Sequence, residues 1–329
     1  MIKSKFITAI FQKYLDNHDI RVFRKSLIYY LLFRIVKNFL SQNIILNIYD
    51  FKVYGSTNKN KTSYFLLKKC EFGDFHELNV IKKLSNKNKI LFFDCGSNYG
   101  FYSLYVASLS KENKIIFLDC GCNYGFYSFY VASLSSENLI FSIEASKKTS
   151  EEFYKNYDLN NFSNITFYNK AISNIDNNNI IFNESENDWE SSQTHKNFKL
   201  LSTTEVKSIK IDTLLSPIKN EDYKVIIKLD IEGNEMRAIQ GALETIKKTS
   251  PLIIMEFSKY IFDYDENIQY FKNFLTSNNY SIYDTNKLKI NLNDITLKIN
   301  ALGPGYDTIG HFYLIKNESK MLKEFLLDE

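Results

Sequence analysis

A tandem repeat of 25 residues is the feature that most constrains how this chain folds. Residues 90–114 (copy one) read ILFFDCGSNYGFYSLYVASLSKENK, and residues 115–139 (copy two) read IIFLDCGCNYGFYSFYVASLSSENL, so that 19 of 25 positions agree. Each copy has an apolar run, the turn Asp-Cys-Gly-x-Asn-Tyr-Gly and an apolar helical stretch. This order predicts a buried strand, a turn that lets the backbone approach a ligand, and a helix whose N-terminus faces that ligand.

Copy two continues into a further apolar strand, IFSIEAS, which carries Glu144. This acid follows Gly125 by 19 residues, close to the spacing of about 20 residues at which an acid on the next strand meets ribose hydroxyls. Gly121 can adopt a turn conformation that side chains disfavour, and Gly125 lets the helix begin close to the strand. Together they predict a site for an adenosine-containing cofactor.

The repeat allows a second register for the same site. Gly96, Asn98 and Gly100 of copy one can form the turn, with Asp119 as the acid, because Asp94 and Asp119 are also 25 residues apart. We favour copy two, because the strand that carries the acid must pair with the strand before the glycine turn for both to reach one ligand.

Length and charge exclude several classes of protein. A chain of 329 residues can form one large domain with additions or two small ones. A net charge of +3 gives no reason to expect nucleic-acid binding. The four cysteines (Cys70, Cys95, Cys120 and Cys122) lack zinc-site spacing, so we expect buried thiols. Without a secretory signal or a long enough apolar stretch, we expect a cytoplasmic protein.

The N-terminal segment and one internal segment differ in composition from the rest. Residues 1–47 have a helical pattern and many basic side chains, which favours a helical cap on the main domain over a helix on an anionic membrane surface. Residues 48–55 and 63–70 predict strands joined by a hairpin loop at 56–62. Residues 174–204 are polar, contain Trp189 and His195, and predict a lid, a binding loop or disorder. His195 could be a general base or stack on a sugar, but we favour an inert histidine, as is usual in exposed loops.

The remaining pattern alternates strands and helices. A helix is expected at 74–84 before the repeat, and after it a helix at 147–160 and a strand at 165–172. Strands follow at 206–211, 224–231 and 252–257, helices at 234–248 and 267–277, and β-type runs at 280–283 and 312–315 before a terminal helix. Such alternation predicts a parallel α/β sheet with helices on both faces.

The stretch IKLDIEGNEMRAIQGALETIKKTSPLIIMEF, ending at Phe257, resembles the FkbM-type family of S-adenosylmethionine-dependent methyltransferases. The DCGxNYGFYS turn, the acid in SIEAS, the KAISN segment and KIDTLL match the same family in order, over roughly Leu78 to Phe257. The resemblance implies a class I methyltransferase (Rossmann-like) sheet of seven strands, the last one antiparallel. We expect this domain at 78–329, after an N-terminal helical and β-hairpin extension at 1–77.

The duplication departs from the family, whose members carry one glycine turn. Copy one has the natural upstream context and copy two the natural downstream context. If copy two forms the cofactor site, we expect the surplus strand and helix at the domain surface, or in place of the preceding helix. A duplication of this kind can leave a defective enzyme.

The resemblance implies roles for particular side chains. S-adenosylmethionine would lie against the turn of copy two and its ribose against Glu144, with the cofactor-binding residues Asp119, Gly121, Asn123, Gly125 and Glu144. Asp230, after a buried strand, is expected to contact cofactor or substrate. Glu232 either accepts the proton of an acceptor hydroxyl or caps the next helix, and Glu235 is expected to cap it. Glu256 ends the neighbouring strand, and no third ligand for a metal is evident.

These residues predict an O-methyltransferase acting on a hydroxyl of a sugar, a glycolipid or a natural-product scaffold. The alternative is a catalytically impaired family member that acts as a binding or scaffold protein in polysaccharide biosynthesis. A nicotinamide-dependent enzyme is disfavoured by the LDIEG strand and by the absence of a third glycine in the turn.

Overall fold

The structure is a computed structural model. It describes residues 2–16, 18, 20–23, 26–40, 44–48, 51–57, 64, 67–68, 89–96, 115–185, 200–216, 218, 223–262, 264–303 and 306–327. The expected helix at 74–84, most of copy one beyond its strand, Trp189 and His195 lie outside these residues.

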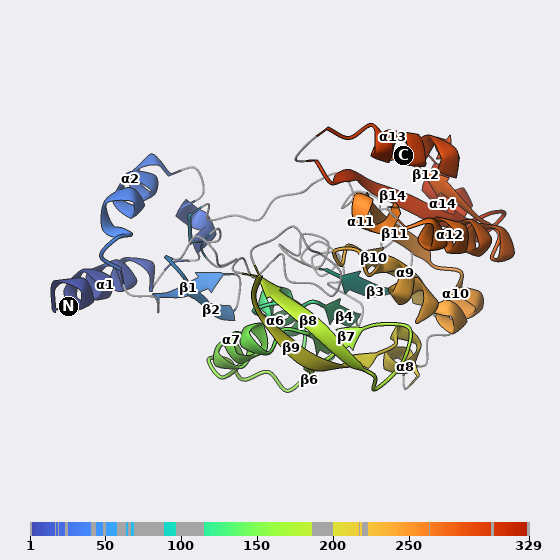
Figure 1. Ribbon diagram of the computed structural model, residues 1–329. Helices are drawn as coiled ribbons and strands as arrows, with labels where there is room; N and C mark the ends of the chain where they lie inside the picture. Colours follow the sequence, from blue (N-terminus) through green and yellow to red (C-terminus); the bar gives the residue numbers. More distant parts are fainter. Residues whose placement is uncertain are drawn as a thin grey trace.

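The N-terminal unit (residues 2–57) contains helices and a hairpin, drawn in blue at one end of Figure 1. Helices α1 (Ile2–Leu15), η1 (Ile20–Phe23) and α2 (Leu27–Val36) precede strands β1 (Ile44–Ile48) and β2 (Phe51–Gly55), which pair antiparallel. The hairpin therefore pairs Ile44–Ile48 with Phe51–Gly55, rather than 48–55 with a second strand after a loop at 56–62. In the second run for which we expected a strand, Leu67 and Lys68 are helical.

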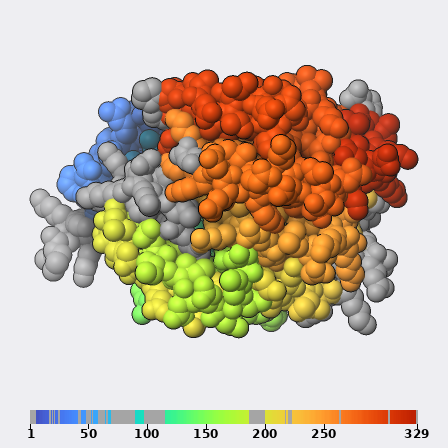
Figure 2. Space-filling view, turned by 45° about the vertical axis from the view of Figure 1, so that its right-hand side comes forward, coloured from blue at the N-terminus to red at the C-terminus, as the bar shows by residue number. Residues whose placement is uncertain are grey.

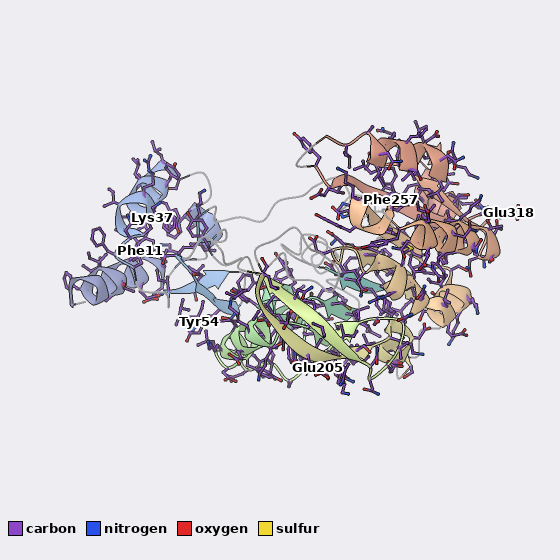
Figure 3. All side chains as sticks on the ribbon, in the orientation of Figure 1. Phe11, Lys37, Tyr54, Glu205, Phe257 and Glu318 are labelled. Atoms are coloured by element: carbon purple, nitrogen blue, oxygen red, sulfur yellow. The ribbon has the colours of Figure 1, made fainter. Side chains whose placement is uncertain are left out.

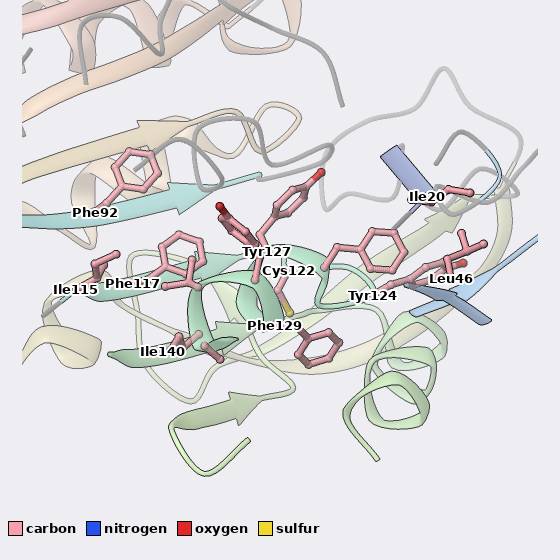
Figure 4. Close-up of a cluster of buried hydrophobic side chains, with 14 of the residues drawn as sticks. Ile20, Leu46, Phe92, Ile115, Phe117, Cys122, Tyr124, Tyr127, Phe129 and Ile140 are labelled. Carbon is pink, nitrogen blue, oxygen red and sulfur yellow. The ribbon is translucent and has the colours of Figure 1, made fainter. Parts of the chain in front are cut away.

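Asparagine side chains of the main domain hold the hairpin in place. The backbone N–H of Tyr54 donates to Asn156 Oδ1 (2.9 Å), and Asn156 Nδ2 donates to the carbonyl of Tyr124 in the glycine turn (3.1 Å; Tyr54 is labelled in Figure 3). Figure 4 shows Leu46 of β1 in the same apolar cluster as Cys122 and Tyr124. The N-terminal unit is thus packed directly against the turn of copy two.

A nine-stranded sheet forms the centre of the molecule, in the order β13-β12-β14-β11-β10-β3-β4-β5-β6. Its strands are β3 (Lys89–Cys95), β4 (Ile116–Cys120), β5 (Leu139–Ile143), β6 (Ile165–Tyr168), β10 (Tyr223–Leu229), β11 (Leu252–Ser258), β12 (Tyr280–Tyr283), β13 (Lys289–Ile290) and β14 (Thr308–Lys316). Setting aside β3 and the two-residue β13 leaves seven strands. The last strand along the chain, β14, is antiparallel to both β11 and β12.

The strand of copy one lies in the middle of this sheet. β3 pairs in parallel with β10 on one side and with β4 on the other. The expectation that the surplus strand would lie at the surface is therefore wrong. The physical reason is its composition: KILFFDC has apolar side chains on both faces, so a central position buries all of them.

Alternate residues of the central strands enter two apolar cores. Phe92 and Phe117 belong to the core beneath α6 (Phe126–Leu134) and α7 (Lys147–Tyr157). Leu91 and Phe93 belong to the core on the other face, to which six helices contribute: α8 (Ile211–Leu215), α9 (Glu235–Gln240), α10 (Leu243–Thr249), α11 (Lys259–Phe262), α12 (Asp265–Ser277) and α13 (Leu292–Asn300). The terminal helix α14 (Lys320–Leu326) packs Phe325 against the first core.

The polar segment 174–204 forms more structure than its composition indicates. β8 (Asn179–Ser185) and β9 (Leu200–Ile209) pair antiparallel, and β7 (Ala171–Ile172) joins β9 in parallel to give a small three-stranded sheet. Phe182 and Val206 pack inward with Ala171. Its two ends are thus paired strands, because alternating apolar residues give them one buried face, while residues 186–199 lie outside the described part of the chain.

Two further elements differ from expectation. The helix predicted at 234–248 is divided into α9 and α10 at Gly241, where a Cβ atom would stand 2.2 Å from the carbonyl oxygen of Ser173. Helix α13 was not predicted. Figure 2 shows the C-terminal elements, in orange and red, above the β8–β9 hairpin, in green and yellow.

Candidate functional site

The turn of copy two connects β4 to α6 through three residues with positive φ. These residues are Gly121 (79°), Asn123 (50°) and Gly125 (81°). A Cβ atom at Gly125 would stand 2.6 Å from the rings of Phe129 and Phe153, so glycine is required for α6 to begin this close to the sheet. A Cβ atom at Gly121 would approach nothing closer than 3.7 Å. The backbone at Gly121 is therefore the more open part of the turn.

Glu144 follows β5 directly and lies against this turn. Its Oε2 accepts a hydrogen bond from the backbone N–H of Asn123 (2.9 Å), and its Oε1 accepts one from the N–H of Ser146 (2.8 Å). The side chain is 7% exposed. The acid and the turn predicted to share a ligand are in direct contact.

Asn123 presents a polar atom that needs a partner. Within the described part of the chain, its Oδ1 is buried and accepts no hydrogen bond. Buried carbonyl oxygens are nearly always hydrogen-bonded in proteins. A ligand with an ammonium or amide donor at this turn would satisfy Asn123, and the amino group of S-adenosylmethionine is such a donor.

Asp119 lies below the turn, inside the layer between sheet and helix. It is fully buried, and its Oδ2 accepts a hydrogen bond from Ser128 Oγ of α6 (2.6 Å). Ser128 Oγ in turn accepts from Ser142 Oγ of β5 (2.7 Å). These contacts tie β4, α6 and β5 together, so they assign Asp119 to supporting the turn.

A second group of polar side chains surrounds the end of β10. Lys228 Nζ donates to the carbonyl of Gly96 (2.8 Å) and to Asp230 Oδ2 (3.1 Å), and it lies 3.5 Å from Asp94 Oδ1. The Lys228 side chain is 3% exposed. Burial alone would lower the pKa of Lys228, but Asp230 and Asp94 outweigh it and raise this pKa above its usual value. Lys228 is thus a buried cation between two carboxylates.

Asp230 is ionised for the reciprocal reason. Burial opposes its charge, but Lys228 and then His311 hold the pKa of this carboxyl well below its usual range. His311 Nε2 lies 3.5 Å from Asp230 Oδ2, and His311 pairs in register with Glu256 on β11. Burial, and then the charge of Asp230, raise the pKa of Glu256 to about 7. Asp230, Glu256 and His311 therefore form one cluster of ionisable side chains at the edge of three neighbouring strands.

Sequence reasoning identified Asp230 and Glu256 but not His311. The histidine stands 81 residues after Asp230, and only the antiparallel pairing of β14 with β11 brings the two together. No spacing in the sequence indicates such a pairing.

The turn after β10 contains Glu232 and leads into Glu235. Glu235 Oε1 accepts from the backbone N–H groups of Ile231 (2.8 Å) and Gly233 (3.3 Å), while its buried Oε2 has no hydrogen-bond partner among the described residues. Burial is the main reason that the pKa of Glu235 rises to about 7. These bonds hold the turn that precedes α9, and they do not cap the N–H groups of the helix itself. Glu232 is partly exposed on the same turn, with a φ of 54°.

The two groups of side chains are separated by the strand of copy one. Gly96 lies between them: a Cβ atom there would stand 1.6 Å from the carbonyl oxygen of Asp230, whereas Gly121 lies on its other side. Two strand spacings, about 10 Å in total, separate β4 from β10. On one side of the sheet β3 is followed outward by β4, β5 and β6, and on the other side β10 is followed outward by β11 and later strands. The order thus reverses between β3 and β10, and ligands of open α/β sheets bind at such a switch point. Gly96 therefore lies at the switch point, and Gly121 lies in the turn beside Glu144, the acid expected to bind ribose.

The cysteines near these turns are buried thiols. Cys95, Cys120 and Cys122 are buried and form no disulfide, and Cys70 lies outside the described residues. A side-chain contact with Cys95, and then burial, raise the pKa of the Cys120 thiol. Within the described residues, no three His, Cys, Asp or Glu side chains are grouped to hold a metal ion, and no helix is long and apolar enough to span a bilayer.

Comparison with known proteins identifies the domain that contains the turn of copy two and the turn after β10. Residues 119–282, about half of the chain, match the family model of the methyltransferase FkbM domain. The chain matches none of the curated proteins searched.

Similar solved structures include an FkbM methyltransferase from Methylobacillus flagellatus KT (17% identity, 72% of this chain and 58% of that chain, TM-score 0.32). Two others are a putative rRNA methylase from Clostridium thermocellum (13%, 66% and 93%, TM-score 0.34) and M. jannaschii TYW2 in complex with AdoMet (11%, 84% and 87%, TM-score 0.31). The chain thus spans less than two thirds of the Methylobacillus flagellatus structure. With its matched domain beginning at Asp119, the chain belongs to the FkbM-type family of S-adenosylmethionine-dependent methyltransferases.

Proposed function

We propose that this protein transfers a methyl group from S-adenosylmethionine to a hydroxyl oxygen of a small acceptor, a sugar, a glycolipid or a natural-product scaffold. The observation that carries the proposal is the contact between Glu144 and the turn of copy two. Through this contact, an acid of the kind that binds ribose lies beside a glycine-rich turn, at the ends of two adjacent strands. The family match also begins at Asp119, in copy two.

The residues of this turn fit the cofactor. Gly121 has a positive φ and no side chain, so the backbone can come close to a ligand. The buried Oδ1 of Asn123 can accept from the amino group, and Glu144 supplies a carboxylate beside the turn for ribose hydroxyls. Gly125 and Asp119 support these three by fixing the start of α6. When bound, the sulfonium of the cofactor supplies an electrophilic methyl group.

The remaining task is to hold and activate the acceptor. Methyl transfer is an in-line displacement in which positioning is the main contribution of the protein. Asp230 is a fixed anion at the switch point, suited to binding an acceptor hydroxyl. Glu232 on the adjacent turn, or Glu256 with its pKa of about 7, would accept the hydroxyl proton as the oxygen attacks.

The alternative proposal is a family member with impaired catalysis that binds a ligand in a polysaccharide pathway. The position of β3 favours it, because this strand separates the turn and Glu144 from Asp230. Both proposals predict binding near the turn, but they differ in whether cofactor and acceptor can meet.

Calorimetric titration with S-adenosylhomocysteine tests the cofactor site. Glu144→Gln removes the charge that accepts from Asn123 and should weaken binding by about tenfold or more. Glu184→Gln is the matched control: this buried glutamate also bonds Ser146, through Oγ (3.0 Å), but is not bonded to the turn. It should bind as the wild type does.

Asp119→Asn distinguishes the two registers. A larger loss in Asp119→Asn than in Glu144→Gln would move the site to the turn of copy one. If the wild-type protein binds no S-adenosylhomocysteine, the methyltransferase proposal is wrong and the scaffold proposal remains.

A further inference from the structure

Nine of the ten residues of α2 are apolar or aromatic, the exception being Arg34, but the described residues cover only one face of the helix. Tyr29 and Phe33 point into the core and are each 2% exposed. The opposite face carries four aliphatic side chains that are largely exposed: Leu27 (69%), Ile28 (75%), Leu31 (49%) and Ile35 (68%). A helix that is apolar on all sides is normally buried on all sides. Among the described residues, the outer face of α2 (Leu27, Ile28, Leu31 and Ile35) stays exposed, although an apolar face of this size is usually covered.

The inner face is firmly fixed, so the helix cannot rotate to bury the outer one. Tyr29 stacks on Phe23 with 5.1 Å between ring centroids, and its hydroxyl donates to the carbonyl of Leu67. Ser26 caps the helix by accepting from the backbone N–H of Tyr29. The exposed face is thus a permanent feature of this fold.

Helix α1 repeats the pattern with a narrower exposed stripe. Phe11 and Leu15 are buried, whereas Phe6 (67%), Ile10 (56%) and Tyr14 (36%) share the opposite side at intervals of four residues. Ten large apolar side chains are exposed within residues 6–39: Phe6, Ile10, Tyr14, Val22, Leu27, Ile28, Tyr30, Leu31, Ile35 and Phe39. Apolar surface concentrated in this way marks an interaction site.

The same segment has a net positive charge, unlike the rest of the chain. Residues 1–47 contain eight Lys or Arg and two Asp, a net charge of +6, so the rest of the chain, with +3 overall, carries −3. On α2 the exposed Arg34 adjoins the apolar face and lies 5.9 Å from the centre of the Tyr30 ring. Helices with exposed aliphatic faces flanked by basic side chains bind in the interface of anionic lipid bilayers.

We propose that α1 and α2 dock the protein onto an anionic phospholipid surface, with the outer face of α2 (Leu27, Ile28, Leu31 and Ile35) inserted among the lipid chains. A second copy of this chain fits less well, because a two-fold interface would bring two segments of charge +6 together. In Figure 1 these helices project at the end opposite the C-terminal elements, which leaves them accessible to a surface. The proposal is independent of the methyl-transfer proposal.

Flotation with vesicles tests it on the full-length protein. The wild type should float with vesicles containing phosphatidylglycerol, should not float with pure phosphatidylcholine, and should be released by salt. The double variant Leu27→Asp/Leu31→Asp should lower the partition coefficient by about a hundredfold, since two aliphatic side chains no longer enter the lipid.

The matched control is Leu288→Asp/Leu297→Asp, which changes two leucines of similar exposure (63% and 67%) in the C-terminal region. It should float as the wild type does. A second variant, Arg34→Gln/Lys37→Gln, keeps the apolar face and should weaken binding only to anionic vesicles. It keeps the test decisive if the aspartate variant does not fold.

Two results would overturn the proposal. One is a wild type that does not float with anionic vesicles. The other is sedimentation showing a dimer that dissociates in Leu27→Asp/Leu31→Asp, which would assign the outer face of α2 to a second copy.

Discussion

The two copies of the repeat have nearly the same sequence but different neighbours in the sheet. In copy two, Asp119 bonds Ser128 of its own helix, and the turn after it meets Glu144 of β5. In copy one, Asp94 at the identical position lies beside Lys228 of β10, and Gly96 is pressed against the carbonyl of Asp230. Copy two therefore adjoins Glu144, the acid expected to bind ribose, and copy one adjoins the charged side chains at the switch point.

This difference shows that position in the sheet decides what a motif does. β3 and β4 pair with an offset of 25 residues, the length of the repeat, so that Asp94 faces Asp119 and Cys95 faces Cys120. In that register β4 would present nearly the same residues to β10 as β3 does. The two strands are therefore interchangeable by geometry and distinct only in their neighbours.

The largest effect is expected when the contact between Asp94 and Lys228, which distinguishes copy one, is broken. Lys228→Met leaves the buried Asp94 without its cation and should lower the free energy of unfolding by about 3–5 kcal/mol. Lys224→Met on the same strand is the control, because Lys224 pairs with the more exposed Glu324 and its loss should cost about 1 kcal/mol or less. Urea unfolding measures both, and equal losses would contradict the distinct role of Asp94.

The second prediction concerns the turn beside Gly96, which Glu235 braces. Burial raises the pKa of Glu235 to about 7 from 4.5. The folded protein then holds a proton that the unfolded chain releases, so the wild type loses stability as pH rises from about 4.5 to about 7 and no further above.

Glu235→Gln removes this titration and keeps the oxygen that accepts from Ile231 and Gly233. Across that pH window the stability of the wild type should fall by about 3 kcal/mol relative to the variant. Unfolding by urea from pH 4.5 to 8 measures the difference, with the exposed Glu244→Gln as a control. Parallel curves for the wild type and Glu235→Gln would show that Glu235 is ionised throughout.

The third prediction concerns β3, the strand that separates the glycine turn of copy two from Asp230. Deletion of residues 90–114 should let β4 take the place of β3 beside β10, so that the glycine turn, Glu144 and Asp230 lie on three adjacent strands. Because Asp230, which we expect to contact cofactor or substrate, would then lie one strand from the turn, S-adenosylhomocysteine affinity should rise by about tenfold in calorimetric titration.

Deletion of residues 115–139 is the matched variant, since it leaves a single copy that differs at only six positions. The two deletions should behave alike. A deletion protein that does not fold, or affinity that does not change in either one, would show that copy one is an integral part of the site.

Much of the fold followed from patterns in the sequence. The apolar runs of the repeat predicted buried strands, and β3, β4, α6 and β5 confirm the order of strand, turn and helix. The spacing of Glu144 from Gly125 predicted their shared location, since adjacent parallel strands end at one edge. The paired strands at the two ends of segment 174–204 were not predicted, because weak alternation of apolar residues is difficult to distinguish from a loop.

By itself the sequence determined the family, the alternation of strands and helices, and the pairing of the glycine turn with its acid. These features are local, set by side-chain period and by short spacings along one chain. Only the tertiary structure decided that β3 lies between β4 and β10, that Lys228 is shared by Asp94 and Asp230, and that His311 joins the cluster. The reason is physical: two strands with the same apolar faces fit a central position equally well, and only packing of the whole sheet selects the neighbours.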